Sequence, residues 1–76
     1  LTDDIESIVL QHADLLIFAN KLKKAEKILL YNLDIHPDSE LLNKKLADVY
    51  TLKGNSRLAD EYYKKSYDLN SEIWSY

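Results

Sequence analysis

Cysteine is absent from this chain of 76 residues, and glycine and proline occur once each, as Gly54 and Pro37. Without cysteine the chain can form neither a disulfide framework nor a thiolate metal site. Because glycine and proline are the commonest turn residues, their scarcity predicts long elements joined by short connections. A chain of this length forms at most one small domain. We therefore expect a single domain over residues 1–76.

Strong charge of one sign is also missing. Ten Lys and Arg residues against 13 Asp and Glu residues give a net charge of −3, which is too mild to indicate a nucleic-acid or membrane partner. No apolar run approaches the roughly 18 residues that a membrane span needs, and no signal-peptide layout is visible. The lack of cysteine fits a reducing compartment such as the cytoplasm. Leu1 in place of an initiating Met predicts a fragment or a processed product.

Apolar residues recur at helical spacing in four segments. The first begins at the capping residue Thr2 and ends near Asn20, which tolerates left-handed backbone at a helix C-terminus. The second and fourth helices are predicted over residues 21–35 and 56–69, and the third runs from a cap at Asp38 or Ser39 to about Lys53. Residues 72–76 resemble the start of a fifth helix. Pro37, Gly54 and the pair Asn70-Ser71 mark the breaks.

Each predicted helix has an apolar face expected to point inward. These faces are Ile5, Ile8, Val9, His12, Ala13, Leu16 and Ala19; Ala25, Ile28, Leu29 and Leu33; Leu42, Leu46, Ala47, Val49 and Tyr50; and Leu58, Ala59, Tyr62, Tyr63, Tyr67 and Leu69. Leu10 and Ile17, seven residues apart, form a second apolar line on the first helix, away from its predicted inward face. His12 is predicted to be a core histidine.

The sequence repeats itself at a fixed offset. Ala13 and Ala47 are 34 residues apart, and so are Ala25 and Ala59. A period in this range is typical of stacked helical repeats. Alanine at the point where paired helices cross lets their axes approach to about 8–10 Å. The sequence therefore predicts two helical hairpins that pack side by side.

The two copies resemble the tetratricopeptide repeat (TPR), a 34-residue helix–turn–helix. Its pattern has a small and then a large apolar or aromatic residue in the first helix, Ala in the second helix and a closing proline. The second copy, residues 40–73, is the closer match and has Leu46, Ala47, Tyr50, Gly54, Asn55, Ala59, Tyr63, Leu69 and Asn70, with Ser71 in the place of the proline. The first copy, residues 6–39, has Ala13, Leu16, Ala25, Leu29 and Pro37, but departs from the pattern at His12, Asn20 and Asn32.

This resemblance implies an all-α fold of tandem antiparallel hairpins wound into a right-handed superhelix. The first helix of each repeat would then line a concave groove that binds a peptide or a protein, with no cofactor and no catalysis. By register the groove residues are Leu10, Asp14 and Ile17 from the first repeat, with Lys44, Asp48 and Thr51 from the second. One TPR subclass binds a C-terminal carboxylate through Lys and Asn in the first helix. Leu10 and Asp14 occupy those places, so that clamp is not expected, although Lys44 would suit it.

The candidate residues leave alternatives open. Asp14 and Asp48 share one register position and form either an acidic stripe for a basic or amide-bearing peptide, or two solvated carboxylates. Leu10 and Ile17 either anchor a partner, or pack on a preceding helix or on a second copy of the chain. No second ligand is spaced to help His12 hold a metal, and no metal site is predicted. Adjacent carboxylates such as Asp60 and Glu61 are interpreted as helical charge scatter and not as a catalytic pair.

The leading functional hypothesis is a non-catalytic adaptor that binds a protein or a peptide. A second hypothesis is self-association, either through Leu10 and Ile17 or through the end that contains Trp74 and Tyr76. A third is a regulatory module that belongs to a larger protein.

Overall fold

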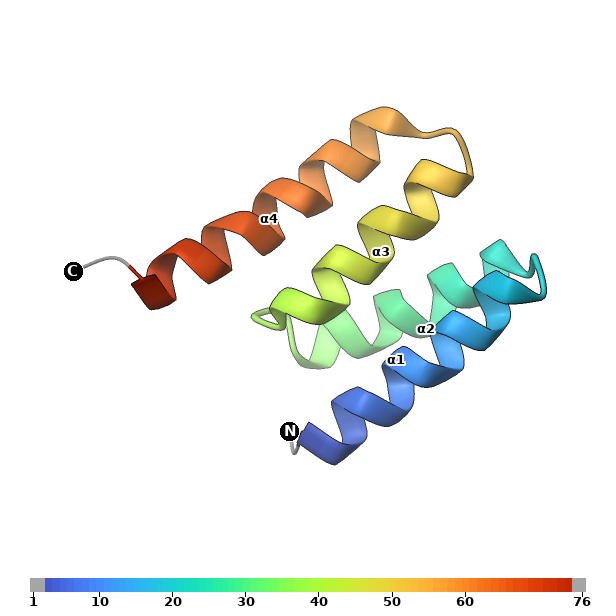
Figure 1. Cartoon of the computed structure of the whole chain (residues 1–76), viewed down its shortest axis with the longest axis horizontal. Helices are drawn as coiled ribbons and strands as arrows, with labels where there is room; N and C mark the ends of the chain where they lie inside the picture. The colour runs from blue at the N-terminus through green and yellow to red at the C-terminus, as the bar shows by residue number, and fades with distance from the viewer. Residues whose placement is uncertain (1–2, 75–76) are drawn as a thin grey trace.

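Four helices make up the part of the chain that the structure describes. The computed structural model describes residues 3–74, with side chains for residues 5–69. The helices are α1 (Asp3–Phe18), α2 (Leu22–Ile35), α3 (Glu40–Leu52) and α4 (Ser56–Trp74). The predicted all-α class is therefore confirmed. Figure 1 shows α1 beside α2 and α3 beside α4, and α3 lies between α4 and the first pair.

The two hairpin turns have the same backbone geometry at equivalent positions. Asn20 has a φ of 59° and Gly54 a φ of 81°, and the two residues are 34 positions apart. The residue after each turn residue donates a backbone hydrogen bond to the carbonyl five residues earlier, in the preceding helix: Lys21 N to Leu16 O at 2.7 Å and Asn55 N to Tyr50 O at 2.9 Å. This is the left-handed helix end that Asn and Gly favour. The sequence repeat is thus also a repeat of local structure.

The end of α2 and the start of α3 lie where the sequence predicts them. The backbone of α2 stops at Ile35, two residues before Pro37, because the residue before a proline is pushed out of helical geometry. Ser39 caps α3, since its Oγ accepts a hydrogen bond from Leu42 N at 3.2 Å. In α4, Asn55 Oδ1 accepts from Leu58 N at 3.1 Å in the same way.

The core lies where the helices cross. The four alanines Ala13, Ala25, Ala47 and Ala59 are each at most 3% exposed. They are joined in the core by Leu29, Leu33, Leu42, Leu46, Val49 and Tyr50. The predicted inward faces of α2 and α3 are therefore confirmed, with Ile28 partly buried against this cluster.

The predicted inward face of α1 is only partly correct. Val9, Ala13 and Leu16 pack into the core, but Ile8 is 63% exposed, and Ile5, His12 and Ala19 are also exposed. Leu10 and Ile17, predicted to lie away from the core, instead pack against it. The exposed side of α1 also includes Leu15 and Phe18, the latter 92% exposed. Because α1 is apolar around most of its circumference, periodicity alone cannot choose its buried side.

The fourth helix also differs from its prediction. Tyr63 and Tyr67, expected to pack inward, are 36% and 71% exposed, whereas Ser66 is buried. The backbone of α4 continues through Asn70-Ser71 to Trp74, so the predicted break and separate fifth helix are wrong as far as Trp74. Neither Asn nor Ser blocks helical geometry as Pro37 does in the first copy. The last part of α4 extends past the start of α3 (Figure 1). Ser66 is buried and Leu69 is partly buried, so Tyr67 is exposed because it lies on the side of α4 that the rest of the described chain does not cover.

None of the helices among residues 3–74 is both long and apolar enough to cross a lipid bilayer.

Enlarging Ala25 should destabilise the fold. Ala25 is fully buried, so the extra atoms of Ala25→Leu must push α1 and α2 apart, at a cost of about 1–3 kcal/mol. For a domain of this size the melting temperature should fall by roughly 5–20 °C. Thermal unfolding followed by circular dichroism measures this. The matched control is Ala19→Leu at an exposed alanine, and equal losses for both variants would contradict the crossing argument.

Candidate functional site

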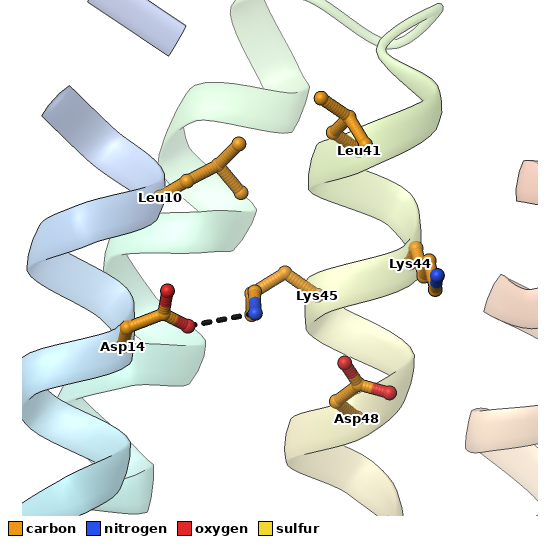
Figure 2. Close-up of a pocket in the computed structure, with 6 residues that line it drawn as sticks. All are labelled: Leu10, Asp14, Leu41, Lys44, Lys45 and Asp48. Carbon is orange, nitrogen blue, oxygen red and sulfur yellow. Dashed lines mark ion pairs between the residues drawn. The ribbon is translucent and has the colours of Figure 1, made fainter. Parts of the chain in front are cut away.

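A surface hollow of about 250 Å³ lies between α1 and α3. It is lined by Leu10 and Asp14 from α1 and by Leu41, Lys44, Lys45 and Asp48 from α3. Figure 2 shows Leu10 and Leu41 side by side at one end, with Asp14 and Lys45 facing each other below them. A second hollow of about 390 Å³ adjoins the first and shares three of its residues, Leu10, Asp14 and Leu41. Together they make a continuous surface between the two helices, which we call the α1–α3 surface.

The structure brings together four of the six predicted groove residues, namely Leu10, Asp14, Lys44 and Asp48. The other two do not line this hollow. Ile17 packs against the core, and Thr51 Oγ1 donates a hydrogen bond to its own helix, to Ala47 O at 3.0 Å.

Sequence reasoning missed Leu41 and Lys45 at this surface. Both lie on one helical face with Asp48, at spacings of four and three residues, and that spacing was the available signal. The TPR pattern did not indicate Leu41 and Lys45, because they are not among the positions that line the groove in that family.

The two carboxylates of the predicted acidic stripe each have a partner within the chain. Lys45 Nζ lies 2.7 Å from Asp14 Oδ1, and the Asp14 side chain is 57% exposed. The hydroxyl of Tyr63 donates to Asp48, and this hydrogen bond raises the pKa of Tyr63. A basic ligand on this stripe would therefore have to compete with Lys45 for Asp14 and with Tyr63 for Asp48.

The remaining lining of the hollow is apolar and cationic. Leu41 is 47% exposed and Leu10 is partly buried, so their side chains form an accessible apolar wall. Lys44 is exposed, and no carboxylate among the side chains of residues 5–69 forms an ion pair with it. The hollow therefore presents an apolar wall beside a positive charge that is available to a ligand.

A polar contact between α2 and α3 holds the two hairpins in place. Glu26 accepts a hydrogen bond from the Tyr50 hydroxyl at 2.7 Å and forms an ion pair with Lys53. The hydrogen bond from Lys53, and to a smaller extent the one from Tyr50, lowers the pKa of Glu26, whereas its partial burial raises that pKa. Burial, followed by the hydrogen bond to Glu26, raises the pKa of Tyr50. The Tyr50 ring stacks on Tyr62 of α4 with centroids 5.7 Å apart, so this contact links α2, α3 and α4.

Other candidate residues lie elsewhere. His12 is exposed on α1, which contradicts its prediction as a core histidine. In the described part of the chain, no group of three or more His, Cys, Asp or Glu side chains is placed to hold a metal ion. The basic cluster at the start of α2 lines a separate shallow hollow with Lys21, Lys23, Lys24 and Lys27. The side chain of Trp74 and the whole of Tyr76 lie outside the described residues.

The fold and the surface define an all-α protein made of two helical hairpins, with an amphipathic surface between their first helices. No protein-family model, curated protein or solved structure matched the chain.

The stabilising effect of Glu26 should disappear in acid. A carboxylate whose pKa is lowered on folding contributes stability above its unfolded value of 4.5 and loses that contribution as the pH falls through its lowered folded pKa. We expect Glu26→Gln to cost about 1–2 kcal/mol at neutral pH. The difference from the wild-type chain should shrink below pH 4.5. Urea unfolding at neutral pH and in acid measures both quantities.

The control for this experiment is Glu61→Gln. Glu61 pairs with Arg57 on the surface of α4, where both side chains are more than half exposed. Such a pair contributes under about 0.5 kcal/mol. If both substitutions have the same effect at every pH, Glu26 has no special role between the hairpins.

Proposed function

We propose that the chain is a non-catalytic, TPR-like interaction module that binds a peptide or a segment of another protein on the α1–α3 surface. The observation that carries this proposal is the pair of adjoining hollows between the first helices of the two hairpins. In the arrangement that the TPR resemblance implies, those are the helices that line the ligand groove. The equivalent turns at Asn20 and Gly54 and the four buried alanines support the repeat interpretation.

The open shape of the hollows favours a peptide over a small metabolite. The first hollow, of about 250 Å³, is smaller than the roughly 300–1,000 Å³ of most small-molecule pockets, and the second, of about 390 Å³, is near the lower limit of that range. Both are open on the surface and suit one side chain at a time. An extended peptide that crosses both hollows would place successive side chains in them.

The lining chemistry indicates which peptide fits. An aliphatic side chain can bury apolar area against Leu10 and Leu41, which is worth about 1.5–3 kcal/mol if burial is complete. A carboxylate next to it can pair with Lys44, which adds at most about 1 kcal/mol at an exposed site. Asp14 and Asp48 already have donors, so a basic peptide would have to displace them. We therefore propose a ligand that carries an aliphatic residue beside an acidic residue or a C-terminal carboxylate.

Reversing the charge of Lys44 should weaken this binding. Peptides are first selected on the wild-type chain from a random dodecapeptide phage library, and the enriched peptide is then made with a fluorescein label. By fluorescence anisotropy, Lys44→Glu should raise the Kd of that peptide about tenfold, because repulsion replaces attraction, and tenfold in Kd is about 1.4 kcal/mol. The enriched peptides should share the aliphatic–acidic pair.

The matched control is Lys24→Glu, the same charge change at an exposed lysine of α2 that does not line the α1–α3 surface. It should change Kd less than about twofold. Equal losses for the two variants would show only a net-charge effect. Enriched peptides that are basic would contradict the proposed ligand chemistry.

A further inference from the structure

Two faces at opposite ends of the helix stack are left largely uncovered by the described part of the chain. On α1, Ile8 and Leu15 are 63% and 68% exposed, with Gln11 and His12 between them; we call these four residues the leading face. On α4, Tyr63 and Tyr67 follow Asp60 on one side of the helix; we call these three residues the trailing face. In Figure 1, α1 and α4 lie on opposite sides of α3, and no backbone contact joins them.

The 34-residue register shows what the leading face is suited to do. Ile8, His12 and Leu15 correspond to Leu42, Leu46 and Val49 of α3. Those three α3 residues are at most 1% exposed and belong to the buried cluster that includes α1 and α2 residues. The leading face is thus the counterpart of the side of α3 that is buried against the first hairpin.

The same register describes the trailing face. Asp60, Tyr63 and Tyr67 correspond to Glu26, Leu29 and Leu33 of α2. Leu29 and Leu33 are buried in the cluster that includes α3, and Glu26 binds Tyr50 of α3 and Lys53, which directly follows α3. The trailing face therefore repeats, in aromatic form, the α2 surface on which α3 packs.

We propose that a second copy of this chain covers these faces, with the leading face of one copy packed against the trailing face of the next. In this arrangement α1 of one copy packs on the α3–α4 hairpin of its neighbour, as α3 packs on the α1–α2 hairpin within each copy. Gln11 takes the place of Lys45, and its amide can donate to Asp48 of the neighbour as Lys45 does to Asp14. A second copy is favoured over an unrelated partner because one chain carries both halves of the interface.

The contact has a definite symmetry. The two faces differ, so the interface is heterologous and each copy retains one open face after pairing. The complex then grows into longer chains or closes into a ring instead of stopping at a two-fold dimer. Of the residues that line the α1–α3 surface, Gln11 belongs to the leading face and Asp48 is its proposed acceptor. Leu10, Leu41 and Lys44 are outside both faces, so this proposal does not depend on the proposed peptide binding.

The two faces are more polar than the internal contact that they repeat. His12 stands where α3 has the fully buried Leu46, and the hydroxyl-bearing Tyr63 and Tyr67 stand where α2 has the buried Leu29 and Leu33. Burying these polar groups opposes association. Assembly should therefore be weak and concentration-dependent, and His12→Leu should strengthen it.

Sedimentation equilibrium of the 76-residue chain tests the proposal. The average mass should rise with concentration from about 10 µM to 1 mM and pass twice the chain mass, as expected for weak association. Leu15→Lys and Tyr67→Lys should each hold the chain at the monomer mass, because a buried unpaired charge is costly. His12→Leu should lower the concentration needed for assembly about tenfold, which is about 1.4 kcal/mol. Circular dichroism confirms that each variant is folded.

The decisive arm mixes the two blocked variants. Leu15→Lys retains an intact trailing face and Tyr67→Lys an intact leading face, so an equimolar mixture should form a dimer that grows no further. The control is Tyr31→Lys at a tyrosine of α2 that is 69% exposed and outside both faces; it should assemble like the wild-type chain. A wild-type chain that remains monomeric at about 1 mM, or a mixture that contains only monomers, overturns the proposal.

Discussion

The structure depends on the burial of α3 between α4 and the first hairpin. Helix α3 is the only helix of the described chain that contacts all of the others. Three of its aliphatic side chains, Leu42, Leu46 and Val49, are almost completely buried. A single helical hairpin cannot bury its apolar surface, so each pair requires the other. The alanines at the crossings make this possible by allowing the axes to approach closely.

The position of α3 also determines the candidate site. Glu26 fixes α3 relative to α2 through Tyr50 and Lys53, and Ser39 at the start of α3 donates a hydrogen bond to Glu6 of α1. These contacts lie at both ends of α3 and hold it against α2 at one end and against α1 at the other. The hollow between α1 and α3 is therefore a consequence of core packing, and its shape does not depend on mobile loops.

Much of this fold was predictable from the sequence, and particular residues show where prediction ended. The faces of α2 and α3 were clear because each helix has one apolar stripe and otherwise polar sides. The face of α1 was not clear, because Ile8 and Leu15 are as apolar as Leu10 and Ile17. Within the site, Asp14 and Asp48 could be placed by register. Their partners Lys45 and Tyr63 could not, since pairing across helices depends on rotation about the helix axis, which a one-dimensional pattern does not contain.

The second apolar side of α1, which made its buried side hard to predict, has a physical explanation. A helix with one packing partner needs one apolar stripe. Helix α3 packs on α4 on one side and on the first hairpin on the other, and it has buried apolar residues on both sides. The sequence of α1 follows the pattern of α3 at Ile8 and Leu15, although no helix of the described chain covers those residues. The uncovered side of α1 is half apolar, whereas the capping helices of helical arrays usually have a polar outer face. In the proposed assembly, a neighbouring copy covers Ile8 and Leu15, so α1 has partners on two sides. A helix with partners on two sides must be apolar on both, and for that reason periodicity did not identify the side of α1 that is buried within one copy.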